Sequence, residues 1–292
     1  MDTQDKLYRG MAGNGQFRFF AVDSTQVVQT ALDLHQMAPA PTLLMGRLLT
    51  AGLLMGADLK DEASSLTLNI EAAGPLKGAI VIYEPAGKVR GYAKQPDFFD
   101  EDISNNLQIG KLLGQGTLNI IRDLKMKAPM TGTIELVTGE IAEDITAYYV
   151  RSEQTPTAVS LGVLFGREGK IRSAGGYLIQ QMPDTNPADA DKLMSNLANT
   201  PYITDLLDMG MPWTDILGRM IFKEMDWTLT DSISVSYYCS CSRERFANAL
   251  RLLGREELES MQEGIAPVCH YCNKHYDFST EDMRQLINSL KI

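Results

Sequence analysis

The sequence predicts an α+β fold, in which an N-terminal, mostly antiparallel sheet domain with helices precedes a helical linker and a small C-terminal domain that carries the cysteines. Three observations predict it. Leu66, Leu68 and Ile70 alternate with polar residues, which is the period of a half-buried strand. The apolar run 43–57 is typical of a buried helix. All four cysteines lie in the last fifth of the 292 residues, and the first 238 residues contain none.

The composition is that of a globular protein. Hydrophobic residues make up 44% of the chain, and 292 residues suffice for a substantial core. The formal net charge is −10 and the isoelectric point is near 4.9. Binding to nucleic acid requires clustered Lys and Arg, and no convincing basic patch occurs along the chain. We therefore expect no nucleic-acid partner.

We expect no secretory signal, because residues 1–5 are acidic and polar. The run 43–57 contains Arg47 and three glycines. It is also shorter than the ~20 residues that a membrane-spanning helix requires. We expect a cytoplasmic protein with no membrane partner. In a reducing cytoplasm, metal binding or redox sensing is a more plausible role for thiols than a structural disulfide.

The domain 1–182 contains the predicted sheet. Residues 16–22 are expected to form a strand, and Ser24 can cap the helix that follows. Thr42, which follows Pro41, can open the apolar helix. The remaining elements are a hairpin of strands 79–83 and 89–93, further strands at 117–122, 131–138, 159–165 and 171–180, and a helix at 140–152.

Residues 183–231 are predicted to be a helical linker that rests on the sheet domain. Pro183 and Pro187 interrupt the strand pattern, and the segment after them is amphipathic. Six of the 15 methionines lie between Met182 and Met225, which suits either ordinary core packing or an adaptable binding surface. The apolar positions are Leu193, Leu197, Ile203, Leu206, Leu207, Ile216, Leu217, Met220 and Ile221.

Residues 232–292 are predicted to form the small domain around the cysteines. Ser242 can cap a helix that Gly254 ends, a second short helix follows, and Ser279 can cap the last helix. Residues 268–278 are expected to form a knuckle and hairpin around C-x-x-C. Because the domain has few large apolar side chains, we expect a metal ion to stabilise it.

The spacing of the cysteines predicts a zinc site. They form a C-x-C pair and a C-x-x-C pair with 27 residues between them: Cys239, Cys241, Cys269 and Cys272. Two close pairs on a foldable segment are typical of a tetrahedral metal site, and four thiolates favour structural Zn²⁺. An iron–sulfur cluster, copper and a bare redox dithiol are the alternatives. His270 and His275 could compete as ligands, but a complete thiolate set makes them unnecessary.

The same spacing suits a redox switch. The simpler interpretation is a purely structural zinc ribbon. However, C-x-C is tighter than the usual knuckle pair, and each pair can close a local disulfide. Zinc would join the two halves of the domain, whereas the disulfides Cys239–Cys241 and Cys269–Cys272 would not. Oxidation would then remove the cross-link from a domain that depends on metal binding to fold.

Candidate catalytic residues are scarce. The chain has three histidines, and only His35 lies outside the last domain. The sequence contains no zinc-protease, serine-hydrolase or phosphate-loop motif. We therefore expect neither an enzyme nor a nucleotide-binding protein, and no catalytic residue is assigned. The carboxylates of Glu140, Glu143 and Asp144 are interpreted as a solvated helix face.

The four cysteines and the domain before them resemble the heat-shock protein 33 family of redox-regulated holdase chaperones. The spacing of the two cysteine pairs near the C-terminus is the most specific part of the resemblance, which extends over essentially the whole chain. Supporting stretches are Gly46-Arg47, Gly74-Pro75, Val89-Arg90-Gly91-Tyr92, Gly139-Glu140, Ser152-Glu153-Gln154-Thr155-Pro156 and Ala174-Gly175-Gly176-Tyr177.

The resemblance implies an ATP-independent chaperone that is inactive while reduced and zinc-bound. Oxidation combined with unfolding stress would form the disulfides, release zinc and unfold the C-terminal domain and the linker. The chain would then bind unfolded client proteins, typically as a homodimer. Two other classes stay open: a constitutive zinc-ribbon adaptor, and a thiol–disulfide oxidoreductase that uses Cys269 and Cys272. Interleaved Arg and Glu at 243–257 disfavour the first, and the expected hairpin disfavours the second.

Overall fold

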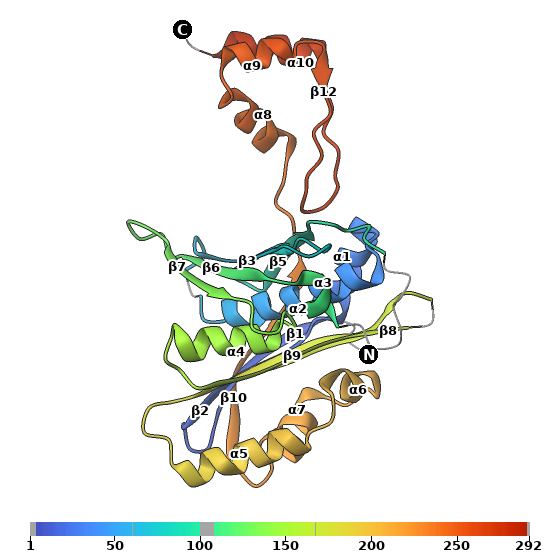
Figure 1. Cartoon of the computed structure of the whole chain (residues 1–292). Helices are drawn as coiled ribbons and strands as arrows, with labels where there is room; N and C mark the ends of the chain where they lie inside the picture. The colour runs from blue at the N-terminus through green and yellow to red at the C-terminus, as the bar shows by residue number, and fades with distance from the viewer. Residues whose placement is uncertain (1–3, 60, 100–107, 167, 291–292) are drawn as a thin grey trace. The chain divides into compact units, whose positions relative to one another are not determined.

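The predicted apolar helix is α2 (Pro39–Gly56), which packs against two β-sheets (Figure 1). All of its side chains except those of Pro39 and Arg47 are buried, which explains why this stretch of sequence lacks a polar face. The computed structural model describes residues 4–59, 61–99, 108–166 and 168–290. The chain forms two compact units, residues 1–237 and residues 238–292.

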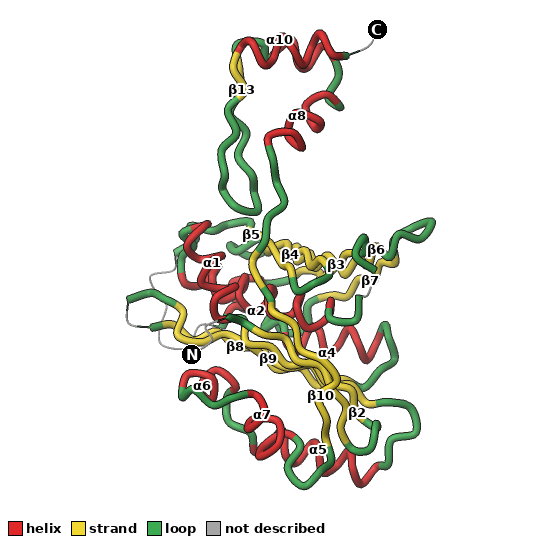
Figure 2. The backbone as a smooth tube through the Cα atoms, turned by 180° about the vertical axis from the view of Figure 1, so that it is seen from behind, coloured by secondary structure: helices red, strands yellow, loops and turns green. Residues whose placement is uncertain are grey.

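The two sheets lie on opposite sides of α2 (Figure 2). Among the described strands every pairing is antiparallel except that of β11 with β5, so the expected antiparallel sheet domain is confirmed. One sheet has the order β10-β1-β2-β9-β8, with strands β1 (Lys6–Ala12), β2 (Phe17–Asp23), β8 (Thr157–Phe165), β9 (Ile171–Gln181) and β10 (Trp227–Ser234). The other has the order β11-β5-β4-β3-β6-β7, with strands β3 (Ser65–Ala72), β4 (Ala79–Glu84), β5 (Lys88–Ala93), β6 (Gly116–Asp123), β7 (Met130–Glu135) and β11 (Ser236–Tyr237).

Most predicted elements of the sheet domain are present, with ends that differ by a few residues. The sequence did not predict β1, β10 or the short helix α3 (Ile109–Leu113). Helix α1 (Thr25–His35) follows Ser24 as expected, but the Ser24 side chain does not cap it. The Asp5 carboxylate instead accepts hydrogen bonds from the N–H groups of Gln26 and Val27, at 3.0 and 2.8 Å. Asp5 therefore joins the residues before β1 to the start of α1.

Strand β2 separates two apolar clusters of the larger unit. Phe20 and Val22 belong to the cluster around α2, whereas Phe17, Phe19 and Ala21 face the helices of the linker. These helices cover the outer face of the five-stranded sheet (Figure 1). They are α5 (Pro187–Asn199), α6 (Ile203–Asp208), α7 (Trp213–Ile216) and the π-helical turn η1 (Leu217–Ile221).

The linker ends in a strand. The expectation of a helix is wrong from Trp227 onward, because β10 pairs with β1 along its length. The larger unit continues to Tyr237, whose hydroxyl donates to the carbonyl of Gly91 at 2.7 Å and lies 3.1 Å from Nε2 of His35. The predicted boundary between residues 231 and 232 thus falls inside β10. The predicted division into a sheet domain 1–182, a linker 183–231 and a C-terminal domain 232–292 stays a prediction.

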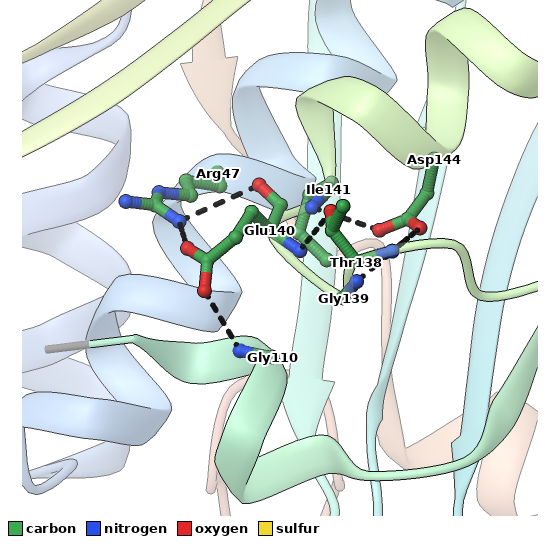
Figure 3. Close-up of polar contacts among 7 residues, drawn as sticks. All are labelled: Arg47, Gly110, Thr138, Gly139, Glu140, Ile141 and Asp144. Carbon is green, nitrogen blue, oxygen red and sulfur yellow. Dashed lines mark hydrogen bonds and ion pairs between the residues drawn. The ribbon is translucent and has the colours of Figure 1, made fainter.

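The carboxylates near the start of α4 (Ala142–Arg151) are held in hydrogen bonds (Figure 3), and the expectation of a solvated face is wrong for two of the three. Asp144 is fully buried. Glu140 precedes the helix, and its carboxylate accepts from Arg47 at 2.5 Å and from the N–H of Gly110 at 2.9 Å. Of the three, Glu143 alone is exposed. Asp144 accepts from four backbone N–H groups, at 2.7 to 3.3 Å: those of Val137, Thr138, Gly139 and Ile141.

The smaller unit contains the predicted helices and hairpin around one apolar cluster. The helices are α8 (Arg243–Arg251), α9 (Arg255–Ser260) and α10 (Thr280–Ser289), with Ser242 and Ser279 capping the first and last as expected. Strands β12 (Gly264–Ile265) and β13 (Phe278–Ser279) pair beside them. The buried cluster includes Leu250, Leu258, Tyr276, Phe278, Met283 and Leu286. In the described parts of both units, no helix has the length and apolarity needed to cross a membrane.

Candidate metal centre

The C-x-x-C pair lies in a tight backbone turn. Val268 and His275 form an antiparallel bridge, and within it the N–H of Cys269 donates to the carbonyl of Lys274 at 3.0 Å. The N–H of Asn273 donates back to the carbonyl of Cys269 at 2.8 Å. Asn273 has a φ of 54°, which Asn tolerates better than most residues. The hairpin predicted around this pair is therefore present.

The C-x-C pair comes directly before α8. The Ser242 side chain accepts a hydrogen bond from the N–H of Arg245 at 3.2 Å, so the N-cap residue directly follows Cys241 and the helix begins at Arg243. This cap fixes the direction of the chain where the pair ends. The two pairs thus come from two well-defined local structures, a helix N-terminus and a hairpin turn.

The four sulfur atoms lie within 4.8 Å of one another. The Sγ atoms of Cys239 and Cys269 are 3.7 Å apart, and those of Cys241 and Cys272 are 3.3 Å apart. In a regular tetrahedron with Zn–S bonds of ~2.3 Å, the sulfurs would be about 3.8 Å apart. The donor set and its spacing therefore fit one tetrahedral metal ion, with protein ligands at all four positions.

The sulfurs differ in their hydrogen bonds. The N–H of Cys241 donates to the sulfur of Cys239, and the N–H of Lys274 donates to that of Cys272. The hydroxyl of Tyr276 lies 3.1 Å from the sulfur of Cys241. Burial raises the pKa of Cys239 and raises the pKa of Cys272 to about 11. Burial also acts upward on Cys241, but hydrogen bonds from Tyr276 and the neighbouring thiols bring its pKa to about 7.

The sequence identified the four sulfurs but missed Tyr276. Tyr276 contacts Cys241 because the hairpin brings residue 276 close to the C-x-C pair. The spacing of the cysteines does not predict this contact. His270 and His275 are exposed, as the fully thiolate site suggested. Among the residues that the structure describes, neither histidine joins the group of four sulfurs.

Comparison with known proteins agrees with this architecture. A family model described as Hsp33 protein matches residues 5–279. A 33 kDa chaperonin of Lachnoclostridium phytofermentans is 38% identical over 97% of this chain and 98% of its own length. A 33 kDa chaperonin of Clostridium botulinum is 39% identical over 98% of each chain.

A solved structure extends the comparison to three dimensions. The crystal structure of a 33 kDa chaperonin, a heat shock protein 33 homologue from Thermotoga maritima, matches with a TM-score of 0.86. The identity is 30%, and the match covers 98% of both chains. Sequence and fold therefore agree over both compact units, and the names of the relatives support a chaperone function. The chain belongs to the Hsp33 family.

Proposed function

We propose that the protein is a redox-regulated, ATP-independent holdase that binds unfolding proteins and prevents their aggregation. In the reduced form the four cysteines hold one Zn²⁺ and the chaperone is inactive. Oxidation converts the thiols into two local disulfides, Cys239–Cys241 and Cys269–Cys272, and zinc is released. The smaller unit and the linker then unfold and expose apolar surface to clients.

The observation that carries this proposal is the meeting of four sulfurs within 4.8 Å in a small unit that has one apolar cluster. A bound Zn²⁺ would join the hairpin to the segment before α8. A unit of this size gains little free energy from its apolar core alone. Structural zinc binding contributes on the order of 10–16 kcal/mol to folding. Loss of the ligand set should therefore unfold the smaller unit.

The oxidation balances with peroxide as the oxidant. A cysteine sulfur attacks one peroxide oxygen, so that an S–O bond forms, the O–O bond breaks, and the departing hydroxide is protonated to water. The second thiolate of the pair attacks the sulfenic sulfur, the S–S bond forms, and a second hydroxide leaves and becomes water. Each disulfide consumes one peroxide, and two peroxides oxidise all four thiols.

The linker and the sheet face beneath it are the candidate client surface. An apolar groove of about 210 Å³ runs between α5 and strands β2, β8 and β9, lined by residues that include Phe17, Ile179 and Leu193. Departure of the linker helices would expose the whole apolar cluster that they share with the sheet. Such a surface suits unfolded chains, because binding needs no particular sequence. The buried members on the linker side include Ile203, Leu206, Trp213, Ile216, Leu217 and Phe222.

The test compares zinc content with the suppression of aggregation of a denatured enzyme, before and after peroxide treatment at elevated temperature and without ATP. The oxidised protein should protect the enzyme and contain no zinc, whereas the reduced zinc form should not protect it. Cys269→Ser should retain zinc poorly. Equal protection by the reduced zinc form would contradict the switch and favour a constitutive zinc-ribbon adaptor.

We further propose that the oxidised protein is a homodimer that works in the cytoplasm without nucleotide, nucleic acid or membrane. The net charge of −10 and the absence of nucleotide-binding motifs from the sequence support this assignment. Light scattering after size-exclusion chromatography should show a mass increase from monomer to dimer on oxidation. An unchanged mass would contradict dimerisation and leave the switch itself intact.

A further inference from the structure

We propose that Tyr276 is a positioning residue of the metal centre, whose hydroxyl donates a hydrogen bond to the Cys241 sulfur and lowers its reactivity toward oxidants. The contact that carries this inference is the 3.1 Å distance between Tyr276 Oη and Cys241 Sγ. The inference rests on the proposed function in one respect, which is that the reduced cysteines bind a metal ion.

The direction of the hydrogen bond follows from the charge state of the sulfur. A cysteine that binds a metal is a thiolate, which can accept a hydrogen bond but has no proton to donate. The phenol must therefore be the donor. The sulfurs of Cys239 and Cys272 accept from backbone N–H groups, whereas Cys241 accepts from a hydroxyl, which is a more acidic donor. A bond of this kind to an anion is roughly twice as strong as one between neutral groups.

Tyr276 is held in place independently of the sulfur. Its side chain is buried, with 7% of the residue exposed. Its ring packs against Phe246 of α8, with ring centroids 4.8 Å apart. Its N–H donates to the carbonyl of Pro267 at 3.0 Å, next to the bridge of the hairpin. Removal of the hydroxyl alone should therefore leave the ring and the hairpin where they are.

The expected consequence is a slower reaction of Cys241 with peroxide. In this reaction the sulfur gives an electron pair to one peroxide oxygen, the O–O bond breaks, and hydroxide leaves and is protonated to water. A hydrogen bond withdraws electron density from the attacking sulfur, and thiolate nucleophilicity follows basicity with a coefficient of about 0.4–0.5. Loss of the Tyr276 hydroxyl should thus accelerate oxidation at Cys241, and the metal loss that follows, about three- to tenfold.

The test is Tyr276→Phe in the full-length reduced chain, loaded with Zn²⁺ or with Co²⁺. Two quantities are measured: the rate at which peroxide releases Zn²⁺ to a chromogenic chelator, and the energy of the sulfur-to-cobalt charge-transfer band. The variant should release zinc about three- to tenfold faster, and its band should shift because one sulfur has lost a hydrogen bond. Tyr202→Phe is the matched control, since it removes a hydroxyl from a side chain of the larger unit that is 82% exposed. It should match the parent in both measurements.

The outcomes separate this inference from the proposed function. A parent protein that retains neither Zn²⁺ nor Co²⁺ would contradict the proposed function. A parent that binds both ions, with an identical band and release rate in Tyr276→Phe, would overturn the role of Tyr276 alone. Faster release with an unchanged band would also overturn it, because the effect would then come from altered packing.

Discussion

A single buried carboxylate can hold an unusual backbone turn of the larger unit in place. Asp144 accepts four backbone N–H groups and stabilises the turn before α4. In that turn Ile141 has φ 71° and ψ −50°, and the N–H of Ala142 donates to the carbonyl of Glu140 at 2.9 Å. This is the geometry of a strained γ-turn, which is unusual for a β-branched residue. Strain of this kind persists only where surrounding contacts enforce it.

Asp144→Ala should therefore be strongly destabilising. It leaves several backbone N–H groups without their acceptor and releases a strained turn, so we expect a loss of more than about 3 kcal/mol in the free energy of unfolding. Urea denaturation measures this change. Glu143→Ala is the matched control on the same helix turn, where the side chain is exposed, and its effect should stay within about 0.5 kcal/mol. Equal effects of the two substitutions would contradict this role of Asp144.

Asp5 should make stability depend on pH. Burial raises the pKa of Asp5 from 3.8 to about 7, against the opposing effect of the N–H groups of Val27 and Gln26. The folded protein therefore binds more protons than the unfolded chain between these values. The stabilisation is fully present below pH 3.8 and is lost as the pH rises through about 7. Its upper limit is about 4 kcal/mol.

The measurement is the urea midpoint between pH 4 and 8 in the parent and in Asp5→Asn. The stability of the parent relative to the variant should fall as the pH rises, because the variant cannot ionise. Asp33→Asn makes the same charge change at an exposed position of α1 and controls for the loss of one carboxylate. If the difference in urea midpoint between the parent and Asp5→Asn does not change with pH, Asp5 has the same pKa in the folded and unfolded chains, and this prediction is wrong.

At the scale of elements, the linker helices depend on their docking to the sheet. Helices α6 and α7 span six and four residues, which is too short for stability in isolation. Phe222, just after η1, is 1% exposed, and its ring centroid lies 5.0 Å from that of Phe19 on β2. The free energy that keeps the linker folded therefore comes largely from this apolar contact.

Phe222→Ala should undock the linker in the reduced zinc form. Removal of a buried aromatic ring costs about 3–5 kcal/mol. Hydrogen exchange over residues 187–222 should accelerate, and the reduced variant should suppress client aggregation without oxidant. Met209→Ala is the control, because that side chain, just after α6, is 78% exposed and does not line the apolar groove. An undocked linker that gives no protection against aggregation would place the client surface elsewhere.

Elements that are stabilised by residues close in sequence could be predicted, whereas elements that depend on distant partners could not. Helix α2 follows from one long, largely apolar run, and the β4–β5 hairpin follows from two strand-like segments on either side of a turn, so their positions could be predicted. Strand β10 could not be, because its residues are mostly exposed at a sheet edge and its structure comes from pairing with β1. The cap of α1 was misassigned to Ser24 for the same reason, since Asp5 acts from 21 residues away.

The candidate site follows the same rule. The four cysteines could be found from their spacing, because metal ligation requires particular residue types in close pairs. Tyr276 could not be found, since its role depends on how the hairpin closes. The carboxylates of Glu140 and Asp144 were misread because a helical pattern does not reveal which acidic residues meet unpaired N–H groups. The sequence pattern therefore does not show which groups a polar side chain will meet in the folded chain.

At the scale of the whole molecule, the chain should divide where its compact units divide. A chain of residues 1–237 retains β10, the linker helices and the anchor of Tyr237 at Gly91. It should unfold cooperatively, with a midpoint close to that of the larger unit in the full protein. A chain of residues 1–182 loses the cover over Phe17 and Phe19 and should be markedly less stable or aggregate. Thermal unfolding followed by circular dichroism distinguishes the two, and equal midpoints would show that the linker adds nothing to stability.

Removal of the metal from the reduced protein should unfold the molecule in a fixed order. The smaller unit has one small cluster, so chelation should abolish amide protection in α8 and α10 first. The amides of the linker helices should lose protection next, because these short helices are stable only while they are docked to the sheet. The sheet around α2 should keep its protection, since its core is much larger and contains no metal ligand. Hydrogen exchange with and without chelator, at neutral pH and in the presence of a thiol reductant, resolves these three classes. Uniform loss of protection would mean that the two units unfold as one, and unchanged protection in α8 and α10 would mean that the metal does not stabilise the smaller unit.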